Sequence, residues 1–286
     1  MPQTTSYIKC SNYYKPPTPN KMSHIQGLSI VLLVVIVVAT HFTVGKTLEY
    51  PNPIHHLRPH PGSGGHRIHN VNCLSWRFAI EANNIQTWKT VPKKCEDYVG
   101  HYMLGAQYKE DCSIVANAAI SYVKGLNISK GKDIWVFDID ETSLSNLPYH
   151  ARPSVGFGAL PYNETGFNKW QEQASAPAIQ SVLNLYNTLI QIGVKVVFLS
   201  GSSDVFREPK SRNMINIGYH TWFKMILKQP NETHMKSVEY KSMHRAMLEN
   251  LGYQIIGNIG DQWSDLLGSN PGLRTFKLPD PMYYIA

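Results

Sequence analysis

The sequence lacks any run of five or more basic residues, although Lys and Arg outnumber Asp and Glu by 27 to 20 and the formal net charge is +7. The positive residues are scattered, whereas a nucleic-acid binder would show a basic tail or stripe. We therefore expect no nucleic-acid partner and interpret the charge as that of a basic soluble surface. Internal repeats are also absent. Hydrophobic residues make up 43% of the 286 residues and charged residues 16%, a balance typical of a folded protein.

Cysteine is scarce, with four residues in the chain. No Cys-x-x-Cys pair and no Cys/His ligand spacing is present, so nothing suggests a zinc site. Cys10 precedes a long apolar run, whereas Cys73, Cys95 and Cys112 follow it. Three cysteines leave room for at most one disulfide among themselves. We expect the pair Cys73–Cys95, with free thiols as the alternative.

One long hydrophobic run lies near the N-terminus, at residues 28–45, after an N-terminal region of residues 1–27. Its apolar core, from Leu28 to Ala39, has the length of a signal-peptide core, whereas a membrane-spanning helix needs about 20 apolar residues. We expect a cleaved signal peptide, with Met22 as an alternative start, and keep an uncleaved signal anchor as the other hypothesis. Both place the rest of the chain in the secretory pathway, either extracellular or vacuolar.

Three Asn-x-Ser/Thr patterns agree with that location, because such acceptors are used only in secreted chains. They begin at Asn127, Asn163 and Asn231. Residues 46–70 are rich in Pro, Gly and His and have no hydrophobic period, so we predict a linker. Its irregularly spaced histidines favour an exposed loop over a transition-metal site. The folded domain is expected over residues 71–286, with a cap insert at about 145–177.

Short apolar strands alternate with helical segments in the folded part. We predict strands at 133–137, 194–199, 254–259 and 274–277, and helices at 107–123, 178–192 and 241–251. This alternation specifies an α/β protein, with a Rossmann-like parallel sheet and helices on both faces. Ligands of such sheets bind beyond the carboxyl ends of the strands, and the polar motifs fall there.

Two carboxylates follow the first predicted strand, in the segment Phe137-Asp138-Ile139-Asp140-Glu141-Thr142. Asp138 is placed to project into the crevice, and a carboxylate can attack phosphorus to give an aspartyl-phosphate intermediate. Asp140 can protonate the leaving alcohol and later deprotonate the attacking water. Acids that merely cap a strand end are the alternative, but two acids and a threonine directly after a buried strand favour catalysis.

Polar residues also follow the second and third predicted strands. Ser200 and Gly201 can hold phosphate oxygens through a hydroxyl and loop amides. After the third strand, Asp261 and Asp265 add two carboxylates. Four acids around one crevice would repel one another severely without a cation, and Mg²⁺ prefers oxygen ligands.

We therefore predict a Mg²⁺ site that includes one backbone carbonyl and in which Asp265 holds a coordinated water. Its residues are Asp138, Asp140, Asp261 and Asp265. Lys241 begins a predicted helix, where the helix dipole disfavours a cation. Neutralisation of Asp138 and of a bound phosphate would explain this lysine, whereas a solvated surface lysine is the alternative.

Five motifs, in this order, resemble the plant acid phosphatase and vegetative storage protein family, subfamily IIIB of the haloacid-dehalogenase superfamily. The motifs are FDIDET, SAPAIQSVLNLY, YKSMHR, GNIGDQWSDLLG and RTFKLPDPMYYI, and the upstream CLSWRFAIEANNIQTWKTVPKKC is also similar. The resemblance covers residues 73–286. It implies a Rossmann-like sheet with a modest cap and Mg²⁺-dependent hydrolysis of small phosphomonoesters.

The resemblance also assigns roles to single residues. It implies Asp138 as nucleophile and Asp140 as acid and base. The remaining roles are phosphate binding by Ser200, Lys241 and the amides of Ile139 and Gly201, and magnesium binding by Asp261 and Asp265.

The chain departs from the family pattern at one position. The family often has Gly-Arg after the hydroxyl residue of the second strand, where this chain has Gly201-Ser202, and Arg207 is a candidate substitute. Some storage members have replaced the nucleophile and are largely inactive. A storage glycoprotein with little or no activity is therefore the alternative function, although Asp138 is intact. A membrane-tethered binding protein is a third hypothesis, which rests on the apolar run alone.

Overall fold

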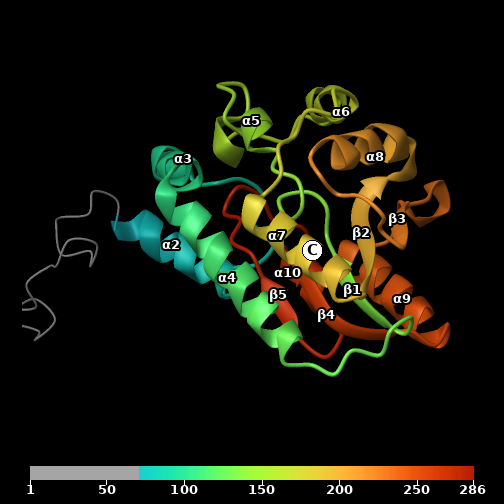
Figure 1. Ribbon diagram of the computed structural model, residues 1–286. Helices are drawn as coiled ribbons and strands as arrows, with labels where there is room; N and C mark the ends of the chain where they lie inside the picture. The colour runs from blue at the N-terminus through green and yellow to red at the C-terminus, as the bar shows by residue number, and fades with distance from the viewer. Residues whose placement is uncertain (1–70) are drawn as a thin grey trace, which may run out of the picture. The chain divides into compact units, whose positions relative to one another are not determined.

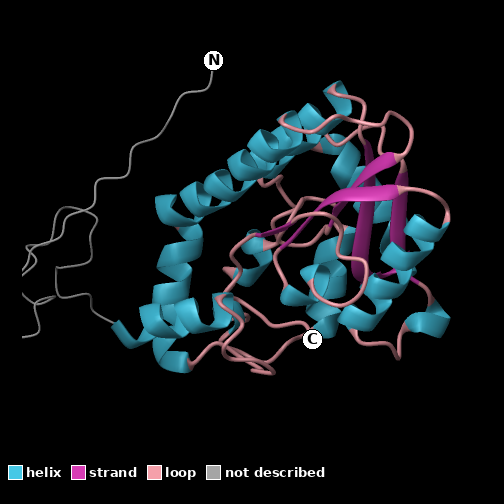
Figure 2. Ribbon diagram, turned by 90° about the horizontal axis from the view of Figure 1, so that it is seen from below, coloured by secondary structure: helices cyan, strands magenta, loops and turns pink. Residues whose placement is uncertain are grey.

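The computed structural model describes residues 71–286, which are built around a five-stranded parallel sheet. The strand order is β3-β2-β1-β4-β5, so β1 lies at the centre. Figures 1 and 2 show helices packed around this sheet. The α/β fold class predicted from the sequence is therefore confirmed. The strands are β1 (Asp133–Phe137), β2 (Lys195–Ser203), β3 (Lys224–Lys228), β4 (Gln254–Gly260) and β5 (Thr275–Lys277).

The N-terminal predictions lie outside the described residues. This applies to the signal peptide or anchor at 28–45 and to the histidine-rich linker at 46–70. Among the helices of residues 71–286, none combines the length and the apolar character that a bilayer crossing requires.

Both faces of the sheet are buried, as expected for a parallel sheet covered on each side. Successive side chains of a strand point to opposite faces. In β1, Trp135 and Phe137 join the larger hydrophobic core, whereas Ile134 and Val136 join a smaller one. All four side chains are fully or almost fully buried. The continuous apolar run before Asp138 is thus explained by burial on both sides.

Two long helices cover the face that carries Trp135. They are α4 (Ala106–Lys124) and α7 (Gln180–Gln191), which pack against each other. Tyr186 of α7 stacks on Phe198 of β2, with ring centroids 6.1 Å apart. Helix α9 (Ser237–Asn250) covers the other face, where Tyr240 and Leu248 enter the smaller core. Outside the predicted cap region, the other helices of residues 71–286 are α2 (Val71–Glu81), α3 (Glu96–Leu104), α8 (Arg207–Asn216) and α10 (Trp263–Leu266), with short turns η2 (Lys93–Cys95), η4 (Asp204–Phe206) and η5 (Pro230–Glu232).

Some elements differ from the sequence-based expectation. Strand β3 was not predicted, because its three apolar residues are flanked by lysines at both ends. Helix α8 was not predicted either, since it has no apolar period: its buried positions include Lys210 and Asn213. Helices α2 and α3 were also not predicted. Helix α9 begins at Ser237, four residues earlier than expected.

The predicted cap region contains three short helical segments. They are α5 (Leu147–His150), η3 (Gly156–Gly158) and α6 (Glu164–Glu172). Figure 1 shows α5 and α6 near each other, with α8 beside α6. Trp170 of α6 stacks with Tyr149 of α5 and donates its indole N–H to Asn146 at 2.8 Å. This hydrogen bond ties the cap to the loop that follows β1.

A disulfide joins α2 to η2. It pairs Cys73 with Cys95, whose Cα atoms are 5.4 Å apart, and Cys112 is a buried free thiol in α4. The disulfide closes a loop with a sequence separation of 22 residues. A cross-link over such a loop restricts the unfolded chain more than the folded one.

Replacing Cys73 and Cys95 together by Ala should therefore lower the free energy of unfolding by about 3 kcal/mol. Urea unfolding of the wild type and the double variant measures this difference. A reducing agent should lower the urea midpoint of the wild type and leave that of the variant unchanged. Equal midpoints of the oxidised wild type and the variant would contradict the prediction.

Candidate active site

The carboxyl ends of three neighbouring strands bring the predicted polar residues together. Asp138 directly follows β1, Ser200 lies near the end of β2, and Asp261 directly follows β4. The backbone N–H of Asp138 donates to the carbonyl of Ile259 at 3.0 Å, which continues the pairing between β1 and β4. All three polar side chains are buried. The structure thus brings these side chains together at the edge of the sheet where parallel topology predicts a ligand site.

Three carboxylates form a compact buried group at this edge. Asp138, Asp261 and Asp265 each offer an oxygen, and these oxygens lie within 4.8 Å of one another. Asp265 belongs to α10, and its carboxylate accepts a hydrogen bond from the backbone N–H of Gln262 at 2.9 Å. Gly260 makes room for it, because a Cβ at this glycine would lie 2.2 Å from an oxygen of Asp265.

Lys241 lies between two of these acids. Its ammonium donates to Asp138 at 2.5 Å and also to Asp265. Burial by itself lowers the pKa of this lysine, but the two carboxylates outweigh burial and raise it above the usual value. Because α9 begins at Ser237, the lysine lies in the second turn of the helix, and the expectation that it starts the helix was wrong.

The charges of this group do not balance within the protein. Burial raises the pKa of Asp138 well above the usual value; the neighbouring acids add to this, and Lys241 opposes it. Burial and the neighbours Asp265 and Asp280 likewise raise the pKa of Asp261. These acids cannot all ionise without more positive charge. Clustered, buried carboxylate oxygens are the donors that a hard divalent cation prefers, so the residues fit Mg²⁺.

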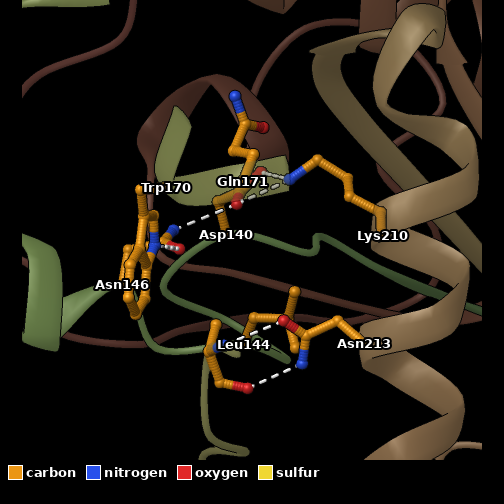
Figure 3. A pocket seen from close by; sticks show the side chains of 8 residues that line it. Asp140, Leu144, Asn146, Trp170, Gln171, Lys210 and Asn213 are labelled. Carbon is orange, nitrogen blue, oxygen red and sulfur yellow. Dashed lines mark hydrogen bonds and ion pairs between the residues drawn. The ribbon is translucent and has the colours of Figure 1, made fainter. Parts of the chain in front are cut away.

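The carboxylate of Asp140 lies outside this group and is surrounded by donors (Figure 3). The ammonium of Lys210 lies 2.8 Å from both of its oxygens. Ser202 donates at 2.9 Å, Asn146 at 3.0 Å and Ser200 at 3.4 Å. Burial would raise the pKa of Asp140, but the ion pair with Lys210 and these hydrogen bonds together hold it below the usual value.

Two local distortions of the backbone build this arrangement. Glu141 has a φ of +54°, which turns the chain directly after Asp140. Its carboxylate accepts the backbone N–H of Asn146 at 2.6 Å and so stabilises the loop. In β2, the pairing register with β3 shifts between Ser200 and Ser203. Such a bulge can re-aim side chains, and Ser202 reaches Asp140 from this segment.

The structure does not bring Arg207, the candidate substitute for the arginine that the family often has, to the acids of the site. Arg207 pairs with Asp204 and donates to the carbonyl of Met225 at 3.0 Å, and it makes no contact with the acids of the site. Lys210, three residues further on, occupies the site instead. Sequence reasoning missed it, because the polar composition of residues 207–216 does not distinguish a buried lysine from an exposed one.

Three further residues come from the segments around these acids. Gly201 is exposed, and a Cβ there would lie 3.4 Å from the hydroxyl of Ser237, so packing alone does not demand a glycine. Thr142 donates to Asp261 at 2.9 Å, a role that sequence reasoning did not assign. Arg245 of α9 donates to the carbonyl of Asp265 at 2.6 Å and thereby supports the short helix α10 that carries this acid.

The predicted glycosylation acceptors are all exposed. Asn127 follows α4, and Asn231 lies in η5. Asn163 precedes α6 and accepts the backbone N–H of Gly166 at 3.0 Å through its side-chain oxygen. That bond leaves its amide nitrogen free to carry a glycan. Exposure is the condition that glycosylation requires, and the modification itself stays a prediction.

An aromatic pair also connects the cap to the site. The ring of His150 in α5 stacks on Tyr283, with centroids 5.6 Å apart, and the Tyr283 hydroxyl lies 3.4 Å from Asp261. His150 is 7% exposed, and its Nδ1 has no hydrogen-bond partner among the described residues. Burial lowers the pKa of His150 to about 4, although the charge of Asp140 opposes this shift.

A parallel sheet with these acids beyond its strand ends is the architecture of the haloacid-dehalogenase superfamily. Within it, the chain belongs to subfamily IIIB, the acid phosphatases, because the model of that family matches residues 63–286. The resemblance read from the five motifs is thereby confirmed.

Curated relatives include both enzymes and storage proteins. The chain is 43% identical to acid phosphatase 1 of Solanum lycopersicum, over 75% of this chain and 84% of that protein. It is 38% identical to vegetative storage protein 2 of Arabidopsis thaliana, over 76% of this chain and 82% of that protein. Among solved structures, the class C acid phosphatase from Bacillus anthracis shares the fold, with a TM-score of 0.55 and 20% identity, over 66% of this chain and 85% of that one.

The buried, uncharged His150 makes stability depend on pH. Its pKa in the folded state, about 4, lies below the unfolded value of 6.5, so the unfolded chain binds the proton first. The stability that neutral His150 contributes is therefore complete above about pH 6.5 and is lost as the pH falls towards 4. This loss amounts to roughly 3 kcal/mol.

Replacing His150→Phe should accordingly flatten the acid side of the stability curve, and urea unfolding between pH 7 and pH 4 measures this. The other titrating groups are common to both proteins, so the difference between the two curves isolates His150. The exposed His234→Phe variant is the control and should follow the wild type. Parallel curves for His150→Phe and wild type would contradict the prediction.

Proposed function

We propose that this protein hydrolyses small phosphomonoesters through an aspartyl-phosphate formed on Asp138, with Mg²⁺ as cofactor. One observation carries the proposal. Asp138 stands at the end of the central strand, within 4.8 Å of two further buried acids and in contact with Lys241. This arrangement provides a nucleophile, a cation site and an ammonium group in one crevice.

In the first step, an oxygen of Asp138 attacks the phosphorus, and the bond from phosphorus to the alcohol oxygen breaks. Asp140 gives a proton to the leaving oxygen. The resting Asp140 is held ionised by Lys210, and the negative charge of an arriving phosphate favours its protonation. Lys241, the Ser200 hydroxyl and the amides of Ile139 and Gly201 are the proposed ligands of the phosphoryl oxygens.

In the second step, water attacks the phosphorus of the aspartyl-phosphate. Asp140 accepts the proton of this water, and the bond from phosphorus to Asp138 breaks. Inorganic phosphate leaves, and the carboxylate of Asp138 is restored. The ion pair and hydrogen bonds that lower the pKa of Asp140 support its role as the base.

The proposed metal ligands come from the loops that follow β1 and β4. Asp138 and Asp261 would bind Mg²⁺ directly, together with the backbone carbonyl of Asp140, and Asp265 would hold a coordinated water. The bound cation would stabilise negative charge on the phosphoryl group. The carboxylate of Asp140 is occupied by Lys210, so its backbone is the part that remains for the metal.

The cellular location is also part of the proposal. The disulfide, the three exposed acceptor asparagines and the storage glycoproteins among the relatives support a secreted protein. The relative named stem 28 kDa glycoprotein of Glycine max is 42% identical over 80% of this chain. We propose an extracellular or vacuolar location.

The test is hydrolysis of an aryl phosphate by the glycosylated, secreted protein with and without Mg²⁺, across acid and neutral pH. Asp138→Asn should lower the rate at least about a thousandfold, because it removes the nucleophile while keeping the side-chain shape. Asp97→Asn changes an exposed acid of α3 in the same way and should match the wild type. Chelation of the metal should abolish the wild-type activity.

The contrary result would be a folded wild type that is no faster than Asp138→Asn at any pH. The storage-protein hypothesis would then be the better one, since storage relatives share the same fold. Detection of a phosphorylated Asp138 by mass spectrometry after an acid quench would independently support the intermediate.

A further inference from the structure

Lys210 is a buried lysine of α8 whose ammonium contacts the proposed acid and base, Asp140. Its side chain is 3% exposed, and both oxygens of Asp140 lie 2.8 Å from its ammonium. Among the described residues, this ammonium bonds to no other group. Figure 3 shows Lys210 reaching from the helix to Asp140, with Asn146 on the opposite side of the carboxylate.

A lysine buried in this way is not explained by solvation or by stability. Burying an ammonium and a carboxylate costs several kcal/mol per ion, and a buried pair often contributes no more than a well-packed apolar pair would. A long apolar residue at position 210 could fill the same space between α8 and the loop after β1. The ion pair between Lys210 and Asp140 therefore indicates a role for Lys210 beyond packing.

The donors around Asp140 fix where its oxygens point. Lys210 bridges both oxygens, Asn146 donates to Oδ1, and Ser202 donates to Oδ2. A general acid must lie within hydrogen-bond reach of the atom that receives its proton, so its orientation decides its effect. Of these groups, only Lys210 holds both oxygens at once.

The two buried lysines contact different acids of the site. Lys241 touches the nucleophile Asp138 and Asp265, whereas Lys210 touches Asp140. In the proposed reaction, Asp138 receives the phosphoryl group, and Asp140 serves the oxygen of the leaving alcohol. Lys210 is therefore on the leaving-group side of the site.

We propose that Lys210 is a positioning residue, which holds the carboxylate of Asp140 in place for proton transfer to the leaving-group oxygen. This inference rests on the proposed phosphatase function. It assigns Lys210 no direct contact with the phosphate and no part in metal binding. A lysine that only stabilised the fold would influence all substrates alike, and this difference makes the proposal testable.

The test compares two kinds of ester. A nitrophenolate leaves without a proton, whereas an alkoxide needs one, so only the alkyl ester depends strongly on a well-placed acid. The ratio kcat/KM reports the step that forms the aspartyl-phosphate. Lys210→Met removes the charge and keeps the length of the side chain. It should lower kcat/KM for an alkyl phosphate about 100-fold and for nitrophenyl phosphate less than about tenfold.

Three further proteins complete the experiment. Lys195→Met removes the same charge from β2 at the opposite end of the sheet, where the lysine donates to the carbonyl of Gly131, and it should match the wild type. Lys210→Arg keeps a cation beside Asp140 and should retain most of the alkyl activity. Ser202→Arg combined with Lys210→Met supplies a cation from the residue that already contacts the same carboxylate, and it should recover at least part of that activity.

The outcomes separate this inference from the proposed function. An inactive wild type would overturn both. An active wild type with equal losses of Lys210→Met on the two esters, or with no loss, would overturn the inference alone. If Lys210→Met does not fold, Lys210→Arg and the double variant decide: alkyl activity near that of the wild type, or a loss that is larger on the alkyl ester, supports positioning. A folded variant with an equal loss on both esters contradicts it.

Discussion

Compensation of buried negative charge is the constraint on which the rest of this structure depends. Asp138, Asp140, Asp261 and Asp265 all lie at the carboxyl edge of the sheet, and three of them converge within 4.8 Å. Two lysines cannot neutralise four acids, so the crevice requires a divalent cation or the protonation of some acids. This deficit would link a bound metal, the ammonium groups and a bound phosphate into one electrostatic system, in which the removal of any member changes the others.

The sheet topology makes this concentration of charge attainable. Because β1 is central and its neighbours run parallel to it, the loops after β1, β2 and β4 open at one edge. The cations come from the helices instead: α9 supplies Lys241 and α8 supplies Lys210. Backbone and side-chain donors then fix the loops, as when Arg245 donates to the carbonyl of Asp265. The acids are thus set by strand ends, and their partners are set by how the helices pack.

This difference explains how much could be predicted from the sequence. The acids after β1 and β4 were predictable, because a buried strand is a local pattern and its end marks the crevice. Strand β3 and helix α8 were not, since β3 has a short apolar run and α8 buries polar residues, which removes the hydrophobic period. The contact of Lys210 with Asp140 spans 70 residues of sequence. Only tertiary packing determines that such a lysine is buried, and no local signal distinguishes it from an exposed one.

The buried acids also distinguish an enzyme from a storage protein. A protein that serves only as a reserve of amino acids gains nothing from acids whose pKa values are raised by burial and mutual repulsion, as those of Asp138 and Asp261 are. Apolar residues at these positions would remove that electrostatic cost and leave the sheet and its two cores intact. This chain instead keeps the acids, two buried lysines in contact with them, and the glycine at position 260 that gives Asp265 its place. Buried acids and lysines that destabilise a fold but lie in contact with one another are typical of a ligand-binding site. Here, their charges and positions suit a cation and a phosphate.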